Sequence, residues 1–230
     1  MIVYGRNPVR EAIRGPRTVK RIWASKNAAR EPWLRPLARI TVGVESEQLE
    51  QLCGSAAHQG VCAEVSPFRY ADDAALLALP SPLIVALDQV QDPQNLGAVA
   101  RSAECAGAAG LVIPERRSAE VTPAVCKASA GAVEHLPVAR TRNLADFLAE
   151  AKRAGLWCYG ADADSSDRYD DVEFDGPIVL VLGSEGRGLR PRVAAACDLL
   201  VSIPLRGRID SLSVSAAAAI LTFAAARSRQ

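Results

Sequence analysis

The decisive stretch of this chain reads Ile178-Val-Leu-Val-Leu-Gly-Ser-Glu-Gly-Arg-Gly-Leu189, and Ile203-Pro-Leu-Arg-Gly-Arg-Ile-Asp-Ser-Leu-Ser-Val-Ser215 follows it. Each segment is an apolar run that stops abruptly in small and polar residues. A buried parallel strand that delivers a loop to a site at its carboxyl end has this pattern. A third segment has the same form, because the apolar run 83–88 is followed by Pro93-Gln-Asn-Leu-Gly-Ala-Val-Ala-Arg101. Three such units predict one ligand site built from three loops.

Around these segments, predicted strands and helices alternate from residue 83 to the end of the chain. Strands are expected at 83–88, 110–113, 136–140, 156–160, 178–183 and 199–203. Helices are expected at 95–107, 122–129, 143–154, 190–196 and 213–228. Alternation of this kind gives a mostly parallel sheet with helices on both faces. The sequence therefore predicts an α/β fold for this part of the chain.

The first 66 residues predict a separate, small α/β domain. A helix is expected to start at Asn7-Pro8, because proline is favoured in the first helical turn. A further helix at 46–53 is expected to be capped by Ser46, with Leu49 and Leu52 facing inward. The remaining elements are strands at 19–24, 40–44 and 60–65 and a helix at 32–40. We expect the domains to be 1–66 and 82–230, joined by a linker at 67–81 that contains a short helical segment.

Charge is distributed unevenly along a chain whose formal net charge is only +1. Residues 1–40 contain ten Lys and Arg residues but only two acids. Such an imbalance favours contact with a polyanion such as RNA, although a solvated basic helix face explains it equally well. The first candidates for RNA contact are Arg6, Arg10 and Arg14.

Several classes of protein are disfavoured by composition. The six cysteines show no CxxC spacing, and the two histidines are far apart, so neither a metal site nor a Ser-His-Asp triad is expected. The start of the chain does not resemble a signal peptide, and its apolar runs are too short or too amphipathic to span a membrane. We therefore expect a soluble cytoplasmic protein with buried, reduced thiols.

The loop at 183–188 is rich in glycine but contains neither GxGxxG nor GK[ST]. This disfavours a dinucleotide-binding loop and a phosphate-binding P-loop. Glycines after a buried strand let backbone groups approach a ligand closely, although a plain strand-to-helix turn is the simpler interpretation. Farther along, Ser211, Ser213 and Ser215 lead into an Ala-rich helix, and one of them is expected to cap it. The positive end of that helix would favour a carboxylate or a phosphate at the same edge of the sheet.

Asn95 and Arg101 lie on the helix that follows the first strand-to-loop unit. Positions 95, 98 and 101 share a helix face, so the two side chains can converge at the mouth of the sheet. The simpler alternative is a surface arginine that pairs with Glu104 on the same helix.

Together the three segments resemble the three motifs of the SpoU/TrmH group of the SPOUT RNA 2′-O-methyltransferases. The motifs are found at 95–103, 182–189 and 203–215, in the order that the family has. The opening Val3-Tyr-Gly-Arg-Asn-Pro-Val-Arg-Glu-Ala-Ile13 also resembles the RNA-binding domain of the ribosomal-RNA branch of this family, the RlmB type.

The resemblance implies a carboxyl-terminal domain tied in a deep trefoil knot, which is a rare exception to ordinary chain topology. It also implies a homodimer in which S-adenosylmethionine binds beside the subunit interface. Carried over to this chain, the residues that would contact the cofactor are Gly183, Ser184, Ile203, Leu205 and Leu212.

Catalytic roles carry over in the same way. The resemblance makes Arg101 the central catalytic residue, which would also touch RNA. Asn95, Glu185 and Ser211 would shape the site around it. One position departs from the family pattern: Ser213 stands where the third motif usually has asparagine. Serine keeps a donor and an acceptor but is shorter and lacks the amide.

Four functions remain open at this point. The leading one is 2′-O-methylation of a guanosine of 23S ribosomal RNA. Methylation of a transfer-RNA ribose is the near alternative, although the amino-terminal domain favours ribosomal RNA. A paralogue that binds RNA without catalysis would have Ser213 as its mark, but Asn95, Arg101 and Glu185 disfavour it. A nicotinamide-dependent dehydrogenase is disfavoured by the missing GxGxxG motif and catalytic histidine.

Overall fold

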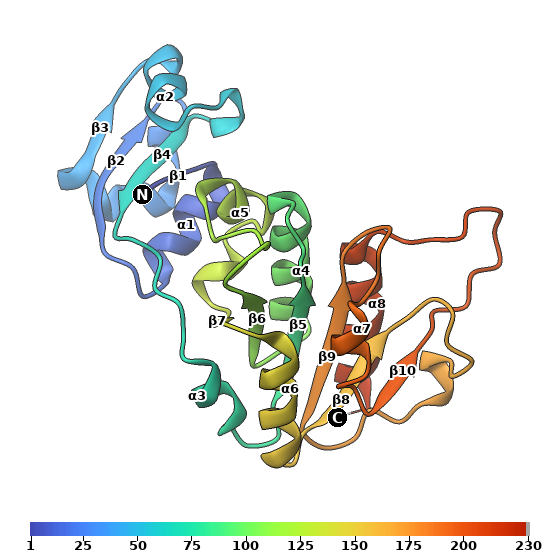
Figure 1. Cartoon of the computed structure of the whole chain (residues 1–230). Helices are drawn as coiled ribbons and strands as arrows, with labels where there is room; N and C mark the ends of the chain where they lie inside the picture. Colours follow the sequence, from blue (N-terminus) through green and yellow to red (C-terminus); the bar gives the residue numbers. More distant parts are fainter. Residues whose placement is uncertain (229–230) are drawn as a thin grey trace.

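The computed structural model describes residues 1–228, which form two domains, each built on a sheet (Figure 1). The smaller sheet has the strand order β1-β4-β2-β3, and the larger has the order β10-β8-β9-β5-β6-β7. All strand pairs of the larger sheet are parallel. The predicted α/β class with a small domain in front is therefore confirmed. The trefoil knot stays a prediction.

The order in which the chain adds strands to the larger sheet reverses at the central strand β5. From β5 the chain adds β6 and β7 on one side, and then it returns to place β8, β9 and β10 on the other. The carboxyl ends of the strands on either side of such a reversal leave a crevice where ligands bind in open α/β sheets. The strands are β5 (Leu83–Asp88), β6 (Gly110–Pro114), β7 (Val138–Thr141), β8 (Trp157–Ala161), β9 (Ile178–Gly183) and β10 (Leu199–Val201).

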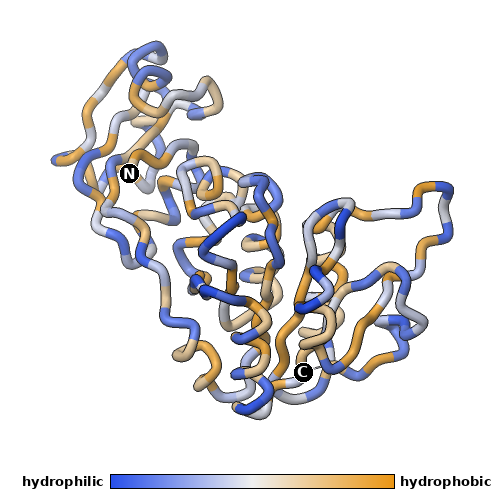
Figure 2. The backbone as a smooth tube through the Cα atoms, viewed as in Figure 1, coloured by the Kyte–Doolittle hydropathy of each residue, from blue (hydrophilic) through white to orange (hydrophobic). Residues whose placement is uncertain are grey.

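Helices cover both faces of this sheet. Successive strand residues point to opposite faces, so each strand contributes apolar side chains to two separate clusters under the helices. Val85 belongs to the apolar cluster beneath α4 (Pro93–Cys105) and α8 (Val214–Arg227), whereas Ala86 packs in a second cluster with α6 (Leu144–Arg153). Figure 2 shows the central strands as hydrophobic runs. Short helices complete the layers: α3 (Asp73–Leu77), α5 (Pro123–Ala128) and α7 (Pro191–Ala194). None of the helices within 1–228 combines the length and the apolar character that crossing a membrane needs.

The amino-terminal sheet is mixed. Its central strand β4 (Val61–Val65) is antiparallel to β1 (Ile2–Tyr4) and to β2 (Val19–Ala24), and β2 is parallel to β3 (Thr41–Gly43). Helices α1 (Arg6–Arg14) and α2 (Ser46–Cys53) pack against strands β1 and β4 of this sheet. Strand β1 is not predicted from the sequence, because a strand of three residues is too short to show a period.

The structure gives the type of one expected helix in this domain and corrects two other expectations. The helix expected at 32–40 is present, as the kinked 3-10 helix Pro32–Ile40, because Pro36 lacks the N–H that a continuous α-helix needs. Glu45, not Ser46, occupies the cap position of α2, and its N–H donates to Gln48 Oε1 at 3.2 Å. The expected inward orientation of Leu52 is also wrong, since its side chain is exposed.

All six thiols are free, as expected from the sequence. The expected burial holds for three of them, whereas Cys105 is exposed. Burial raises the pKa of Cys158 and of Cys197 to about 12, and that of Cys126 to about 11. These groups are therefore protonated at neutral pH and are poor nucleophiles.

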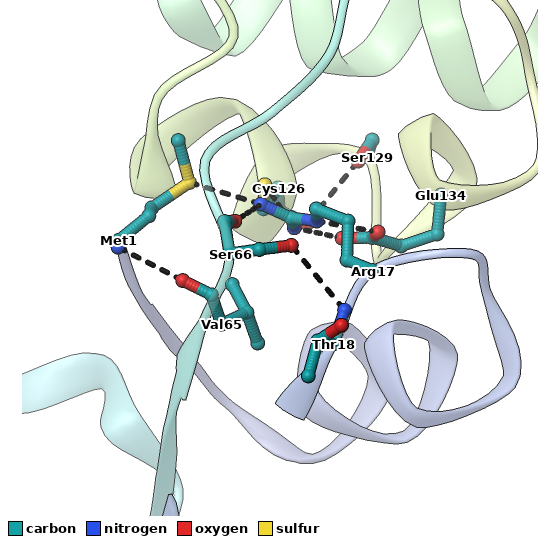
Figure 3. Close-up of polar contacts among 8 residues, drawn as sticks. All are labelled: Met1, Arg17, Thr18, Val65, Ser66, Cys126, Ser129 and Glu134. Atoms are coloured by element: carbon teal, nitrogen blue, oxygen red, sulfur yellow. Dashed lines mark hydrogen bonds and ion pairs between the residues drawn. The ribbon is translucent and has the colours of Figure 1, made fainter. Parts of the chain in front are cut away.

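A buried ion pair joins the two domains. Arg17, which follows α1, pairs with Glu134 of the larger domain, and both side chains are almost completely buried (Figure 3). Arg17 Nε donates to Glu134 Oε2 at 2.8 Å, and its Nη1 lies 3.2 Å from the sulfur of Met1. Burial alone would disfavour the charged guanidinium, but the hydrogen bond and charge of Glu134 raise the pKa of Arg17. Apolar residues of both domains surround the pair in one continuous cluster.

The chain between the domains also contacts the larger sheet. Ala71 forms a bridge with Ala139 of β7, and the hydroxyl of Tyr70 accepts a hydrogen bond from the N–H of Val121 at 2.9 Å. The domain limits 1–66 and 82–230 stay a proposal.

We predict that Glu134→Ala destabilises the protein by about 3–5 kcal/mol, because it leaves the Arg17 charge buried and unpaired. Urea unfolding followed by circular dichroism measures the loss. Glu150→Ala is the control, since the Arg153–Glu150 pair is exposed and such pairs contribute about 1 kcal/mol or less. The double variant Arg17→Met with Glu134→Leu is expected to recover most of the loss. Equal stability of Glu134→Ala and Glu150→Ala would contradict a stabilising role for the buried pair.

Candidate active site

A cavity of about 480 Å³ opens at the carboxyl edge of the larger sheet. Its walls are the loops that follow β8, β9 and β10, together with the start of α8. The lining combines apolar side chains such as Leu182 and Val201 with exposed backbone of the glycine-rich loop. A flat, largely apolar ligand with a few polar groups suits such a cavity.

Every residue predicted to bind the cofactor lies in the wall of this one cavity. Glu185 and Ser211, which were predicted to shape the catalytic site, line it as well. The five cofactor candidates found there are Gly183, Ser184, Ile203, Leu205 and Leu212. The structure thus brings together two loops that are separated by a strand and a helix in sequence.

Glycine is required at position 183 by close packing of the backbone. A β-carbon there would overlap the backbone of Gly188 and Leu189, because the loop folds back over the end of β9. The N–H of Gly188 donates to the carbonyl of Ser184 at 2.9 Å and closes this turn. The turn therefore presents backbone groups to the cavity, as the glycine pattern suggested.

A buried carboxylate anchors the other end of the same loop. Asp88, the last residue of β5, accepts hydrogen bonds from the N–H of Arg190 at 2.9 Å and from its Nε at 2.8 Å. The Asp88 side chain is fully buried, whereas that of Arg190 is half exposed. Asp88 and Arg190 are 102 positions apart, so no local sequence pattern predicts that they pair.

A second cavity of about 260 Å³ adjoins the first and shares Ser184, Glu185, Arg187 and Val214 with it. Its remaining wall consists of the loop after β5 and of Asn95 on α4. Asn95 Nδ2 donates to Glu185 Oε1 at 3.2 Å, which joins the first and second motifs. The resemblance placed both residues in the site, but their direct contact was not predicted from the sequence.

Arg101 lies outside both cavities. It is exposed on α4, six residues beyond Asn95, which corresponds to about 9 Å along a helix axis. The alternative pairing with Glu104 is not formed either, and within residues 1–228 Arg101 makes no ion pair. The predicted convergence of Arg101 with Asn95 is therefore not present within one copy of the chain.

The cavity also contains a segment that the sequence analysis missed. Residues 161–164, Ala-Asp-Ala-Asp, begin at the last residue of β8 and line the same cavity as the glycine-rich loop. A signal was present, because the apolar strand Trp157–Ala161 ends in polar residues as the other three units do. Asp162 and Asp164 place two carboxylates near any ligand in the cavity.

Ser213 has a clear structural role. It is the cap residue of α8, and its Oγ accepts a hydrogen bond from the N–H of Ala216 at 3.2 Å. Serine and asparagine are about equally good helix caps, so the cap is preserved where the family pattern has asparagine. Val214, the first residue of α8, borders both cavities, so the positive end of this helix faces the site.

Comparison with known families assigns both parts of the chain. Residues 82–223 match the SpoU rRNA Methylase family, and residues 2–71 match the RNA 2′-O ribose methyltransferase substrate binding family. The first match alone covers more than half of the chain.

Individual relatives extend over the whole length. A Bacillus subtilis (strain 168) protein, provisionally named TrmH family tRNA/rRNA methyltransferase YacO, is 38% identical over 99% of this chain and 95% of its own. The 23S rRNA (guanosine-2′-O-)-methyltransferase RlmB of Pseudomonas putida is 36% identical, over 99% of this chain and 96% of its own. The AdoMet-bound rRNA methyltransferase from Sinorhizobium meliloti superposes with a TM-score of 0.83 at 26% identity, covering 98% of this chain and 86% of that structure.

The fold and the site thus define an S-adenosylmethionine-dependent RNA 2′-O-ribose methyltransferase. The chain belongs to the SpoU/TrmH family of tRNA and rRNA methyltransferases. The large cavity fits the cofactor, since its apolar walls suit an adenine ring and its backbone groups and two carboxylates suit polar substituents.

We predict that Gly183→Ala weakens S-adenosylmethionine binding by on the order of tenfold or more, equivalent to about 1.4 kcal/mol. The added β-carbon must push the loop away from Gly188 and Leu189 and thereby distort the cavity wall. Isothermal titration calorimetry measures the affinity. Gly43→Ala is a matched control, because no atom lies within 4 Å of its β-carbon position. Unchanged affinity in Gly183→Ala would show that this turn does not form the cofactor site.

Proposed function

We propose that this protein methylates the ribose 2′-hydroxyl of a guanosine in 23S ribosomal RNA. The observation that supports this most strongly is the full-length match to the Pseudomonas putida enzyme, which includes the amino-terminal domain. That domain is docked to the larger one by a buried ion pair, so it is an integral part of the molecule. Methylation of a transfer RNA is the second candidate, favoured by the mixed tRNA/rRNA name of the Bacillus subtilis relative.

In this proposal the two adjoining cavities have different occupants. The larger one holds S-adenosylmethionine, with Gly183, Ile203 and Leu212 as its main contacts. When bound, the cofactor supplies an electrophilic methyl group on a sulfonium. The smaller cavity receives the acceptor nucleotide, which must be splayed out of the RNA to enter it.

Glu185 is placed to orient the acceptor. Its side chain borders both cavities, and the hydrogen bond from Asn95 fixes one of its carboxylate oxygens. The other oxygen can accept a hydrogen bond from a ribose hydroxyl and hold it in line for displacement. Ser211, at the rim of the larger cavity, adds a hydroxyl that can donate or accept. Positioning of this kind accounts for a large part of the rate in group transfer.

Arg101 has a different role, because a guanidinium with a pKa above about 12 is a poor base at neutral pH. In our proposal it grips the phosphate next to the acceptor ribose with both ends of its fork and stabilises the developing alkoxide. Proton removal then passes to the phosphate or to water.

The exposed position of Arg101 supports a homodimer. Helices α4 and α8 pack against each other, and Phe223 of α8 is a half-exposed aromatic residue. Two copies that meet on this face would bury the ring and would bring Arg101 to the site of the partner subunit. A two-fold symmetric interface would form two such sites.

Within the amino-terminal domain, RNA contact falls to arginines that are not already neutralised. Arg10 and Arg14 pair with Glu11, and Arg6 pairs with Glu31. Exposed pairs of this kind are weak, so these three predicted contacts remain part of the proposal. In the described chain, five further exposed cations of this domain form no ion pair: Arg21, Lys26, Arg30, Arg35 and Arg39.

The assay that tests the function measures tritium transfer from S-adenosylmethionine to bulk RNA from cells that lack this gene. Label in the large ribosomal RNA, abolished in Arg101→Ala, is the expected outcome. Label confined to transfer RNA would replace the ribosomal assignment with the second candidate. Absence of label with the cofactor still bound would refute catalysis and indicate a protein that only binds RNA.

We predict that Arg101→Lys has at most about one-tenth of the wild-type kcat, because lysine keeps the charge but lacks the planar fork. Single-turnover methyl transfer with saturating RNA measures this step. Near-wild-type activity of Arg101→Lys would defeat the argument from bidentate geometry.

We predict that mixing Arg101→Ala with Glu185→Ala restores activity, although each variant alone is inactive. If Arg101 acts on the partner subunit's site, half of the dimers are mixed and one of their two sites is intact, giving about a quarter of wild-type activity. The mixture is prepared by co-expression with different tags, and the parent variants are the controls. Continued inactivity of the mixture would place Arg101 in the site of its own subunit.

A further inference from the structure

Three exposed arginines lie at the carboxyl edge of the larger sheet, on the side away from the cofactor cavity. Arg116 and Arg117 follow β6, and Arg142 follows β7. We call these three residues the arginine rim. Within the described chain none of them forms an ion pair. Figure 2 shows strongly hydrophilic segments where the chain leaves these two strands.

The arginine rim is close to the acceptor cavity. β6 lies beside β5, and β7 lies beside β6, so their carboxyl ends are about 5 and 10 Å from that of β5. The loop after β5 lines the acceptor cavity through Gln89 and Val90. The carbonyl of Val90 accepts hydrogen bonds from the N–H of Ala119 at 2.9 Å and from Ser118 Oγ at 3.3 Å. The rim loop is therefore attached directly to the wall of that cavity.

Further contacts hold this loop in a single shape. Arg140 donates to the carbonyl of Glu115 at 3.0 Å, pairs with Glu120 at 3.3 Å and stacks over the ring of Tyr70 at 5.2 Å. The N–H of Val121, the residue after Glu120, donates a hydrogen bond to the hydroxyl of Tyr70. Because the loop is fixed at both ends, the two arginines at its tip are presented to solvent with little freedom in the backbone.

The backbone of Arg117 is itself unusual. Its φ is 57°, in the left-handed region of backbone conformation that residues other than glycine and asparagine rarely adopt. Glycine would adopt this φ without steric strain. An arginine at a strained turn beside an active site suggests that its side chain is used.

We propose that the arginine rim binds the phosphate backbone of the substrate RNA next to the nucleotide in the acceptor cavity. Guanidinium groups recognise phosphate through paired hydrogen bonds and contribute without regard to base sequence. The loop after β6 carries two carboxylates, those of Glu115 and Glu120, and in the described chain the carboxylate of Glu120 pairs with Arg140 rather than with the arginine rim. The rim also lies beside the segment that connects the two domains, so RNA held by the amino-terminal domain could reach the cavity across it.

This inference rests on the RNA methyl transfer assigned above but not on the choice of ribosomal RNA. The test therefore uses whichever RNA the wild-type protein labels. A wild type that labels no RNA would refute the proposed function and, with it, the rim. A labelled RNA with an unaffected rim variant would refute the rim alone.

The experiment compares the triple variant Arg116→Gln, Arg117→Gln and Arg142→Gln with the wild type. RNA affinity is measured by fluorescence anisotropy across a series of salt concentrations. Removal of three phosphate contacts should lower the magnitude of the log Kd against log salt slope by about 2, at roughly 0.7 for each contact on single-stranded RNA. The KM for RNA should rise while kcat and the affinity for S-adenosylmethionine stay unchanged.

Two further variants separate binding from folding. Arg153→Gln removes an exposed arginine at the end of α6, at the opposite edge of the sheet, and should leave the salt slope unchanged. Arg117→Gly relieves the left-handed strain, so its Tm should not fall although its RNA affinity does. A triple variant with the same slope as Arg153→Gln would overturn the proposal. So would a fall in kcat with unchanged KM, because that pattern would mean that the loop only supports catalysis.

Discussion

The parallel pairing of β5 with β9 is the constraint on which the active site depends. Its register sets Asp88 opposite Gly183, so both strands end at the same level. Asp88 can therefore hold Arg190 at the far end of the glycine-rich loop while Gly183 begins it. The loop after β5 leads into α4, and this places Asn95 of α4 within hydrogen-bond distance of Glu185 in the glycine-rich loop after β9. One register thus fixes two loops and the contact between them.

A second interaction sets the position of the amino-terminal domain. The Arg17–Glu134 pair is shielded from water and surrounded by apolar residues of both domains. A buried ion pair contributes little net stability when compared with apolar residues, but breaking it is costly, so it favours one relative arrangement of its neighbours. A basic domain held in this way presents its charges at a defined distance from the cavities, which a flexible tether would not do.

The sequence predicted most of the fold because its patterns were local. The buried runs at β5 and β9 were identified with their observed bounds, and the α/β alternation followed from them. The predicted cofactor residues share one cavity because loops after parallel strands must meet at one edge. The anchor at Asp88 and the domain pair at Arg17 escaped detection, because a contact between residues about 100 positions apart leaves no local signal. The predicted convergence of Arg101 with Asn95 is not present within one copy of the chain, since helical spacing alone does not determine which other elements surround each residue of a helix.

Net charge is a poor guide to how this protein holds RNA. The chain is nearly neutral, yet charges separated by more than about 8 Å are largely screened from one another at physiological salt. A phosphate therefore responds mainly to the few guanidinium groups near it, and a carboxylate paired with one of these groups weakens that response. The arginines of α1 are paired, whereas Arg101 and the arginine rim are not. Arg101 lies on α4, and the arginine rim lies beyond the ends of β6 and β7. This placement, rather than total charge, would direct the RNA backbone past the acceptor cavities of the proposed dimer.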